Sequence, residues 1–205
     1  MRLRYRAAGR AIAVAAFFAL AATSESQAPL RPTFVRDLIR AAVAQTESRV
    51  TYDGSYRRIA YPGGDVPAHI GVCTDLIVRA YRAVGVDLQV RVHEDMTGAF
   101  AAYPRAWGLS RPDSNIDHRR VPNLQTYFRR RGAARAVSTN GGDYAAGDLV
   151  TWMLPGNVPH IGLVTDQRSS DGQRPLMAHN IGRGPEIEDM LFAFPVTGHY
   201  RYGGE

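Results

Sequence analysis

The sequence predicts an α+β domain, in which helices come first along the chain and an antiparallel sheet follows. Apolar residues recur at helical spacing in the first part of the chain, and a two-residue period replaces this spacing in the last third. A polar connection between two of the alternating segments contains Asp171-Gly172, a pair that suits a hairpin turn. The length of 205 residues is that of one ordinary domain.

The helical part contains four expected helices. The first covers residues 32–50, with Thr33 available as its N-cap, and the second begins at Cys73 and is ended by Gly85. Apolar residues at 88, 90 and 92 then alternate briefly, and residues 93–103 form a short helix. A last helix runs from residue 122 to residue 131, with a proline in its first turn and a glycine after its end.

The sheet is expected around residues 149–153, 160–164 and 175–181. Residues that lie directly opposite each other in a hairpin share a face of the sheet. A two-residue turn at Asp171-Gly172 therefore puts His179 on the face of His160, whereas a bulge would put Asn180 there instead. We prefer His179.

Residues 1–28 have the pattern of a secretory signal, with four arginines followed by a short apolar run. We therefore expect a periplasmic or secreted protein whose domain covers residues 29–205, with no integral membrane segment once the signal is removed. Removing the four arginines and Glu25 lowers the formal net charge from +6 to +3. So small a charge argues against nucleic acid as a partner.

Cys73 is the only cysteine, and it opens a helix whose apolar face includes Ile77. An exported chain with one cysteine forms no internal disulfide, so the thiol is buried and inert, paired with another chain, or reactive. The helix N-terminus favours a thiolate by only about 0.3–1 kcal/mol, which is less than one pKa unit. A reactive thiol therefore needs a basic partner.

His160, at the head of an expected strand, is the candidate for that partner. In cysteine peptidases the thiol attacks a carbonyl while an imidazole takes its proton and later returns it. Histidine suits this role because its pKa lies near working pH. A third group orients the ring, and this group is His179 or, in the other register, Asn180.

Three segments of the sequence resemble the papain-like superfamily, specifically the NlpC-type cell-wall peptidases. They are Tyr61 with Gly63-Gly64 ahead of Cys73, then the segment 146–150, and then the segment 160–164. Segments between Tyr52 and Tyr202 also resemble a bacterial family of exported proteins of unknown function that is placed in that superfamily. The resemblance implies a papain-like fold with helices packed on an antiparallel sheet and the nucleophile at a helix N-terminus. It also implies that Tyr61 places a hydroxyl near the oxyanion site.

The sequence departs from the peptidase pattern around the cysteine. Val72 replaces an aspartate, and Thr74-Asp75 replaces Ser-Gly. A carboxylate at Asp75 opposes thiolate formation unless it points away or pairs with an arginine. The segment 117–120 is either a substrate-recognition loop or a salt-bridged, solvated loop. The candidates for substrate binding are Tyr61, Asp75, Asp117, His118, Arg119 and Asn180.

The sequence thus predicts a monomeric, exported thiol hydrolase that cleaves an amide bond, with Cys73 as nucleophile, His160 as base and His179 as orienter. Peptidoglycan stem peptides are the substrate that the resemblance and the export signal imply, and no cofactor is expected. A catalytically silent wall-binding module of the same fold is the alternative. A metal hydrolase built from His118, His160, His179 and Asp117 is a weaker one, because no His pair at i and i+4 on one helix appears.

Overall fold

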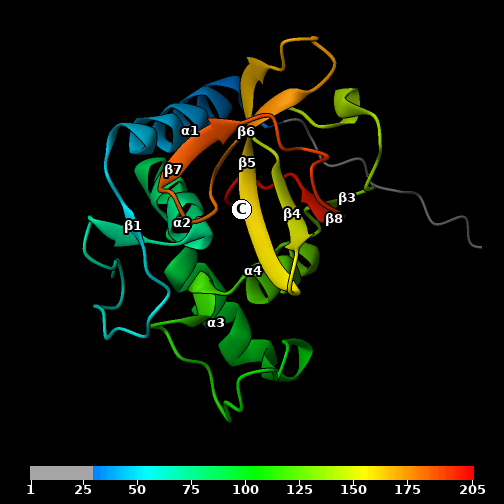
Figure 1. Ribbon diagram of the computed structural model, residues 1–205. Coiled ribbons are helices and arrows are strands. Elements are labelled where there is room, and N and C mark those ends of the chain that lie inside the picture. Colours follow the sequence, from blue (N-terminus) through cyan, green and yellow to red (C-terminus); the bar gives the residue numbers. More distant parts are fainter. Residues whose placement is uncertain (1–29) are drawn as a thin grey trace, which may run out of the picture.

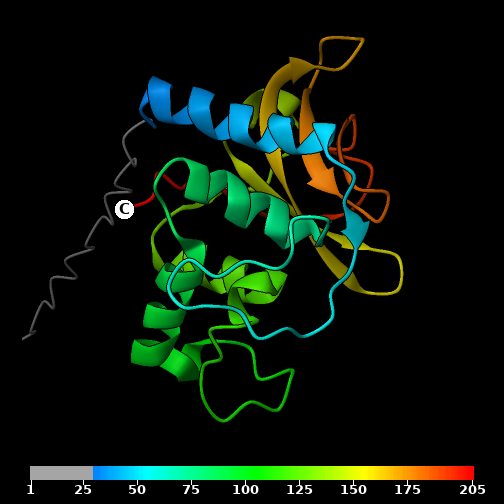
Figure 2. The same ribbon diagram turned by 90° about the vertical axis from the view of Figure 1, so that its left-hand side faces the viewer.

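The computed structural model describes residues 30–205, so the expected signal segment lies outside the described residues. Helices α1 (Pro32–Ala44) and α2 (Cys73–Ala83) lie side by side and pack on one face of a six-stranded antiparallel sheet. Figures 1 and 2 show this layer of helices against the strands. The structure therefore has the expected α+β class.

The sheet has the strand order β3-β8-β4-β5-β6-β7, and every neighbouring pair is antiparallel. Its strands are β3 (Ala134–Arg135), β4 (Leu149–Leu154), β5 (Val158–Arg168), β6 (Pro175–Asn180), β7 (Pro185–Glu188) and β8 (Val196–Tyr200). A separate parallel pair joins β1 (Thr51–Tyr52) to β2 (Ile70–Gly71), directly before α2. The remaining α-helices are α3 (Leu88–Ala99) and α4 (Val121–Arg130). Short 3₁₀ helices are η1 (Gln45–Glu47), η2 (Phe100–Ala102), η3 (Asp117–Arg119) and η4 (Gly141–Asp143).

The first helix differs from its expected form at both ends. It begins at Pro32 after the extended residue Arg31, and no side chain caps it, so the expected Thr33 cap is wrong. Proline favours the first helical position because its fixed φ is already helical and its missing N–H is not needed there. The α-helix ends at Ala44 and passes into η1, rather than continuing to residue 50.

The alternation at Leu88, Val90 and Val92 belongs to a helix, which corrects the expected break before residue 93. Asp87 caps α3 by accepting a hydrogen bond from the Gln89 N–H at 3.0 Å. Leu88, Val92 and Met96 lie four residues apart, and all three are buried. The local cap and this stripe outweigh a three-residue alternation.

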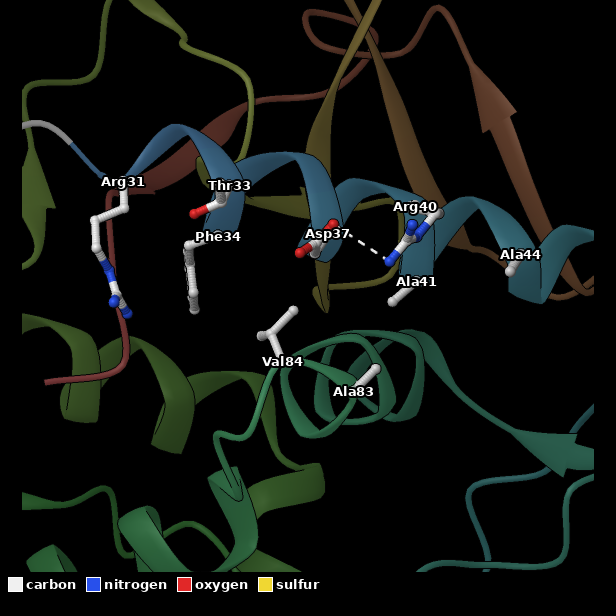
Figure 3. A pocket seen from close by; sticks show the side chains of 9 residues that line it. All are labelled: Arg31, Thr33, Phe34, Asp37, Arg40, Ala41, Ala44, Ala83 and Val84. Carbon is white, nitrogen blue, oxygen red and sulfur yellow. Dashed lines mark ion pairs between the residues drawn. The ribbon is translucent and has the colours of Figure 1, made fainter.

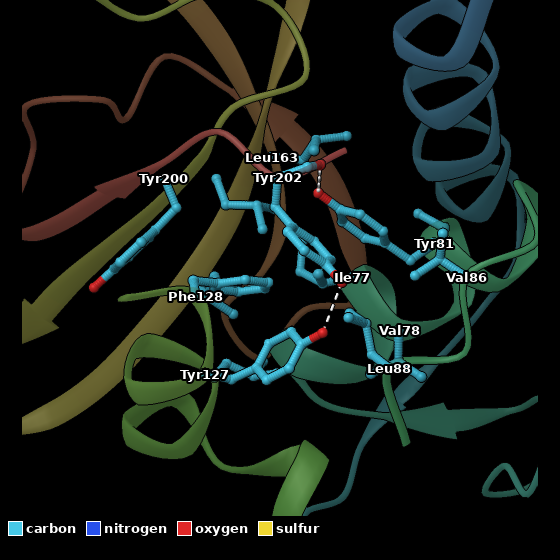
Figure 4. Packing of buried hydrophobic residues seen from close by; sticks show 14 of the residues in the cluster. Ile77, Val78, Tyr81, Val86, Leu88, Tyr127, Phe128, Leu163, Tyr200 and Tyr202 are labelled. Carbon is cyan, nitrogen blue, oxygen red and sulfur yellow. Dashed lines mark hydrogen bonds between the residues drawn. The ribbon is translucent and has the colours of Figure 1, made fainter. Parts of the chain in front are cut away.

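The sheet separates two apolar clusters. The larger one lies under the helices and contains Cys73, Ile161 and Leu163, and the smaller one on the other face contains Trp152 and Val164. Figure 4 shows aromatic rings of the larger cluster. In it the Tyr81 hydroxyl donates to the Tyr202 carbonyl at 2.9 Å, and the hydroxyls of Tyr127 and Tyr202 lie 2.6 Å apart. Tyrosine thus enters this core because each hydroxyl finds a partner.

The register of β5 against β6 decides which side chains share a face. Arg168 lies opposite Pro175 near the turn, and Leu163 lies opposite Ala178 farther on. The register is irregular between these pairs. From Val164 to Arg168 the β5 strand advances by four residues, while β6 advances by only two, from Met177 to Pro175. An even offset leaves the faces unchanged, so His179 stays on the face of His160, as preferred, and the reversal that a bulge could have caused does not occur.

Among residues 30–205, no helix combines the length and the apolar character that a membrane crossing requires.

Candidate active site

Cys73 is the first residue of α2 and is 4% exposed. Val72 before it is extended, and its N–H donates to the Asp75 carboxylate at 2.7 Å, which fixes the start of the helix. The sulfur is in contact with the backbone N–H groups of Ile161 and Thr74 and with the Tyr52 hydroxyl. The same hydroxyl also contacts the backbone N–H of Cys73. The thiol is therefore held between a helix, a strand and a tyrosine.

The sulfur of Cys73 lies beside β5 just beyond the last residue of β5 that pairs with β6. The pairing of these two strands runs from Leu163 toward the turn, and the backbone N–H of Ile161, beyond the last paired residue, faces the sulfur. His160 is the neighbour of Ile161, and consecutive Cα atoms are about 3.8 Å apart. The backbone of His160 therefore lies next to the sulfur.

The side chain of His160 lies on the face of the sheet that carries Trp152. The two residues are directly opposite each other in the pairing of β4 with β5, and their ring centroids are 5.8 Å apart. Ile161 points to the other face, where α2 packs. The His160 ring therefore lies on the opposite face of β5 from the Cys73 sulfur, and the expected contact between thiol and imidazole is not present in residues 30–205.

His179 is the polar partner of His160. The Nε2 atom of His160 lies 3.2 Å from Nδ1 of His179, and the two rings meet edge to face. Nε2 of His179 in turn lies 2.9 Å from a carboxylate oxygen of Glu188 on β7, although their alignment falls outside that of a hydrogen bond. The contact between His160 and His179 that the hairpin parity predicts is present.

This chain of groups selects one tautomer for each ring. The Glu188 carboxylate only accepts, so we assign the proton of neutral His179 to Nε2, which leaves Nδ1 as the acceptor. His160 must then donate from Nε2, and its Nδ1 carries the lone pair. The ring nitrogen of His160 that is not bound to His179 is therefore the basic one.

Burial sets the ionisation state of both candidate catalytic groups. Desolvation raises the pKa of the Cys73 thiol to about 11, and the nearby Asp75 charge adds to this, while the N–H of Ile161 opposes it. Desolvation lowers the pKa of His160 to about 3, helped by the neighbouring His179. At neutral pH the site holds a thiol and a neutral imidazole, not an ion pair.

Asp75 and Arg119 form a buried ion pair beneath the thiol. Both guanidinium nitrogens Nε and Nη2 donate to the carboxylate, at 2.8 and 2.9 Å. Arg119 also donates to the carbonyls of Asp53 and Ser55, both at 3.2 Å, and its own carbonyl accepts from Thr74 at 3.0 Å. Of the two alternatives for Asp75, pairing with an arginine is the one present. The same arginine connects the segment after Tyr52 to the start of α2.

Asp117 and His118, predicted to contact substrate, are buried as well. Asp117 accepts from the Asp113 N–H at 2.5 Å and from Arg120 at 3.1 Å. Desolvation, with Arg119 and Arg82 nearby, lowers the pKa of His118 to about 4. Asp75, Asp117 and Arg119 are thus engaged in hydrogen bonds inside the protein, whereas Nδ1 of the buried His118 has no partner among the described residues.

The structure places Tyr52, not Tyr61, at the thiol. Tyr61 is 43% exposed and packs against the His93 ring, with centroids 5.0 Å apart. Asn180 is buried, and its side chain accepts from the Gly182 N–H at 3.1 Å. Sequence reasoning missed Tyr52 and Glu188. The parallel pairing of β1 with β2, in which Tyr52 lies opposite Gly71, brings Tyr52 to the cysteine.

No group of three or more His, Cys, Asp or Glu side chains in residues 30–205 is arranged to hold a metal ion. A cavity of about 510 Å³ lies between α1 and the end of α2, lined by Phe34, Arg40 and Val84 among others (Figure 3). Cys73 begins the same helix about 15 Å away along the axis, at 1.5 Å per residue. This cavity is therefore separate from the thiol.

The comparisons with known proteins agree with one another. A family model described as a domain of unknown function (DUF1287) matches residues 39–202. The uncharacterized protein YijF of Escherichia coli (strain K12) is 54% identical over 158 residues, which is 77% of each chain. The chain belongs to the DUF1287 family.

Proposed function

We propose that the protein is an exported thiol hydrolase of the papain-like, NlpC-type fold that cleaves an amide bond. One observation carries the proposal: the Cys73 thiol sits at a helix N-terminus against the N–H of Ile161, while the adjacent residue His160 carries an imidazole backed by His179 and Glu188. Thiol, base and orienting groups in this order are the components of nucleophilic acyl transfer.

The proposed reaction requires the His160 ring to reach the sulfur from the other face of β5 when substrate binds. In it the sulfur of Cys73 attacks the carbonyl carbon of the amide, and its proton passes to Nδ1 of His160. The backbone N–H of Cys73 stabilises the oxyanion that forms, with the Tyr52 hydroxyl beside it. His160 then gives the proton to the leaving amine, and water releases the acid from the thioester.

The ionisation states favour proton transfer during attack. A thiol with a pKa of about 11 and an imidazole with a pKa of about 3 do not exchange a proton at rest. The proton must therefore leave the sulfur as the carbon–sulfur bond forms, when His179 and Glu188 stabilise the imidazolium. Substrate binding that changes the solvation of the pair would bring the two pKa values closer together.

Peptidoglycan stem peptides are the proposed substrate, on the basis of the resemblance to cell-wall peptidases and the expected export signal. The test is to incubate purified sacculi with the mature protein and to identify the released fragments by mass spectrometry. We expect release by the unmodified protein and by Arg168→Gln, whose exposed side chain lies at the far end of β5 from His160, but none by Cys73→Ser or His160→Asn. Intact sacculi in every sample would overturn the wall substrate.

A catalytically silent wall-binding module is the second candidate, and the burial of the sulfur favours it. Co-sedimentation with sacculi separates the two functions. The silent module predicts the same binding by Cys73→Ser and by unmodified protein, and no released fragment from either. Fragment release that depends on Cys73 excludes it.

A further inference from the structure

A polar cavity of about 630 Å³ lies outside the thiol site, between the segment that follows β1 and the segment that follows η2. Its walls include Tyr56 and Arg58 on one side and Arg111 and Asn115 on the other, and His93 of α3 also lines it. Figures 1 and 2 show the two segments, cyan and green, at the end of the molecule opposite the turn between β5 and β6.

Hydrogen bonds between the two segments hold this cavity open. The Asn115 side chain accepts from the Ile59 N–H at 3.0 Å and donates to the Tyr56 hydroxyl at 3.1 Å. The Gln89 side chain donates to the carbonyls of Ala60, at 2.8 Å, and Ser114, at 3.0 Å. These bonds join two segments from different parts of the chain. The walls of the cavity are therefore fixed relative to each other before any ligand arrives.

The unpaired charges that line the cavity are positive. Arg58 and Arg111 make no hydrogen bond or ion pair with any residue in the range 30–205, whereas most other arginines there do. The Asp113 carboxylate also lines the cavity and accepts from both the N–H and the side-chain amide of Asn115, at 2.9 and 2.7 Å, so the lining carries two arginines against one aspartate. Nδ1 of His93 is buried and has no partner among the described residues.

We propose that this cavity binds the carboxylate of an acidic residue in a peptide, and this deepens the proposed function by naming a feature of its substrate. Two guanidinium groups present forked donors that match the two oxygens of a carboxylate.

The cavity and the thiol lie within reach of one peptide. Tyr52 contacts the sulfur and Tyr56 lines the cavity, and four extended residues span at most about 14 Å. An acidic side chain a few residues from the scissile amide would therefore enter the cavity. The cavity would therefore favour acidic peptides as substrates.

Binding is tested on the full chain carrying Cys73→Ser, and again on the unmodified chain, by NMR titration. The probes are acetylated and amidated Ala-Glu-Ala and its Ala-Gln-Ala counterpart, which differ only in the carboxylate. We expect the acidic peptide to bind at least about fivefold more tightly, because a hydrogen bond to a charged group contributes more than a neutral one. Arg58→Gln and Arg111→Gln should each remove most of this difference.

Arg168→Gln is the matched control, because it makes the same charge change on β5 near the turn at the opposite end of the molecule. Equal binding of the two peptides, or equal losses in Arg168→Gln and Arg111→Gln, would overturn the proposal. So would inorganic phosphate that displaces the acidic peptide at a lower concentration than the peptide itself requires. Since Cys73→Ser cannot form a thioester, the result does not depend on whether the protein hydrolyses sacculi.

Discussion

Arg119 holds both carboxylate oxygens of Asp75 in the interior, with side chains that are only 2% and 4% exposed. Asp75 lies in the first turn of the helix that Cys73 opens, and Arg119 also binds two carbonyls of the segment after Tyr52. The pair therefore connects the nucleophile to the tyrosine that covers it. The Asp75 charge still raises the pKa of the Cys73 thiol, although Arg119 holds the carboxylate in a bidentate pair.

Replacing Arg119 by methionine should destabilise the protein by about 3–5 kcal/mol, because the Asp75 carboxylate would remain buried and unpaired. Urea unfolding followed by circular dichroism measures the change. The double variant Arg119→Met with Asp75→Asn should recover part of the loss, since it removes the buried charge as well. Arg183→Met is the control, because Arg183 pairs with Glu186 at the surface and its loss should change little. Equal stability of Arg119→Met and the unmodified protein would contradict the role of the pair.

Tyr52→Phe should slow the alkylation of Cys73. The Tyr52 hydroxyl contacts the sulfur and lowers the pKa of the thiol, in opposition to the burial that raises it. Loss of one hydrogen bond to a developing thiolate corresponds to about a fivefold lower rate, at about 1 kcal/mol. The rate of iodoacetamide labelling at fixed pH, followed by intact mass, measures this effect.

Tyr56→Phe is the matched control for the tyrosine experiment, because its hydroxyl accepts from Asn115 and not from the cysteine environment. We expect Tyr56→Phe to label at the unmodified rate. A Tyr52→Phe rate that equals it, or exceeds it, would show that the hydroxyl does not support the thiolate.

The labelling rate of Cys73 should rise steeply with pH. Only the thiolate reacts, and with a pKa of about 11 its fraction increases about tenfold for each pH unit up to that value. An ordinary thiol levels off above a pKa of about 8.5. Rates from pH 7 to pH 11 in the folded protein, beside the protein unfolded in urea, distinguish the two. A plateau below pH 9 in the folded chain would contradict the buried, neutral thiol.

The hairpin of the sheet was largely predictable from the sequence. Asp171-Gly172 fixes the register near the turn, and the alternation of β5 fixes which residues face α2, so the contact between His160 and His179 followed from parity. The start of α2 at Cys73 and its end before Gly85 were also predictable, because Gly85 adopts a positive φ that favours glycine.

The partners that come from distant segments were not predictable. Arg119 reaches Asp75 across 44 positions of the chain, and Glu188 comes from an edge strand with no clear alternation of its own. Tyr52 reaches the cysteine through a pairing of only two residues per strand, which leaves no periodic signal. Burial of Asp117 and His118 depends on how η3 packs against α2 and α3, and a polar segment gives no local sign of this.

The buried histidine should make the protein sensitive to acid. The pKa of His160 is about 3 in the folded protein and about 6.5 in an unfolded chain. Between these two pH values the unfolded state binds a proton at His160 and the folded state does not. The resulting stability is fully present above about pH 6.5 and is lost as the pH falls toward 3. Between pH 7.5 and 4.5, protonation of this group in the unfolded state should lower the free energy of unfolding by about 2.5–3 kcal/mol.

His160→Gln isolates this contribution, because glutamine does not titrate. Urea unfolding at both pH values should show that the unmodified protein loses about 2.5–3 kcal/mol more on acidification than the variant does, whatever the carboxylates contribute to both. His69→Gln, at an exposed position, should keep the full loss. If His160→Gln and His69→Gln lose the same free energy, the folded protein binds a proton at His160 as readily as the unfolded chain does. Proton transfer from Cys73 would then start from a solvated imidazole rather than from the neutral, buried ring.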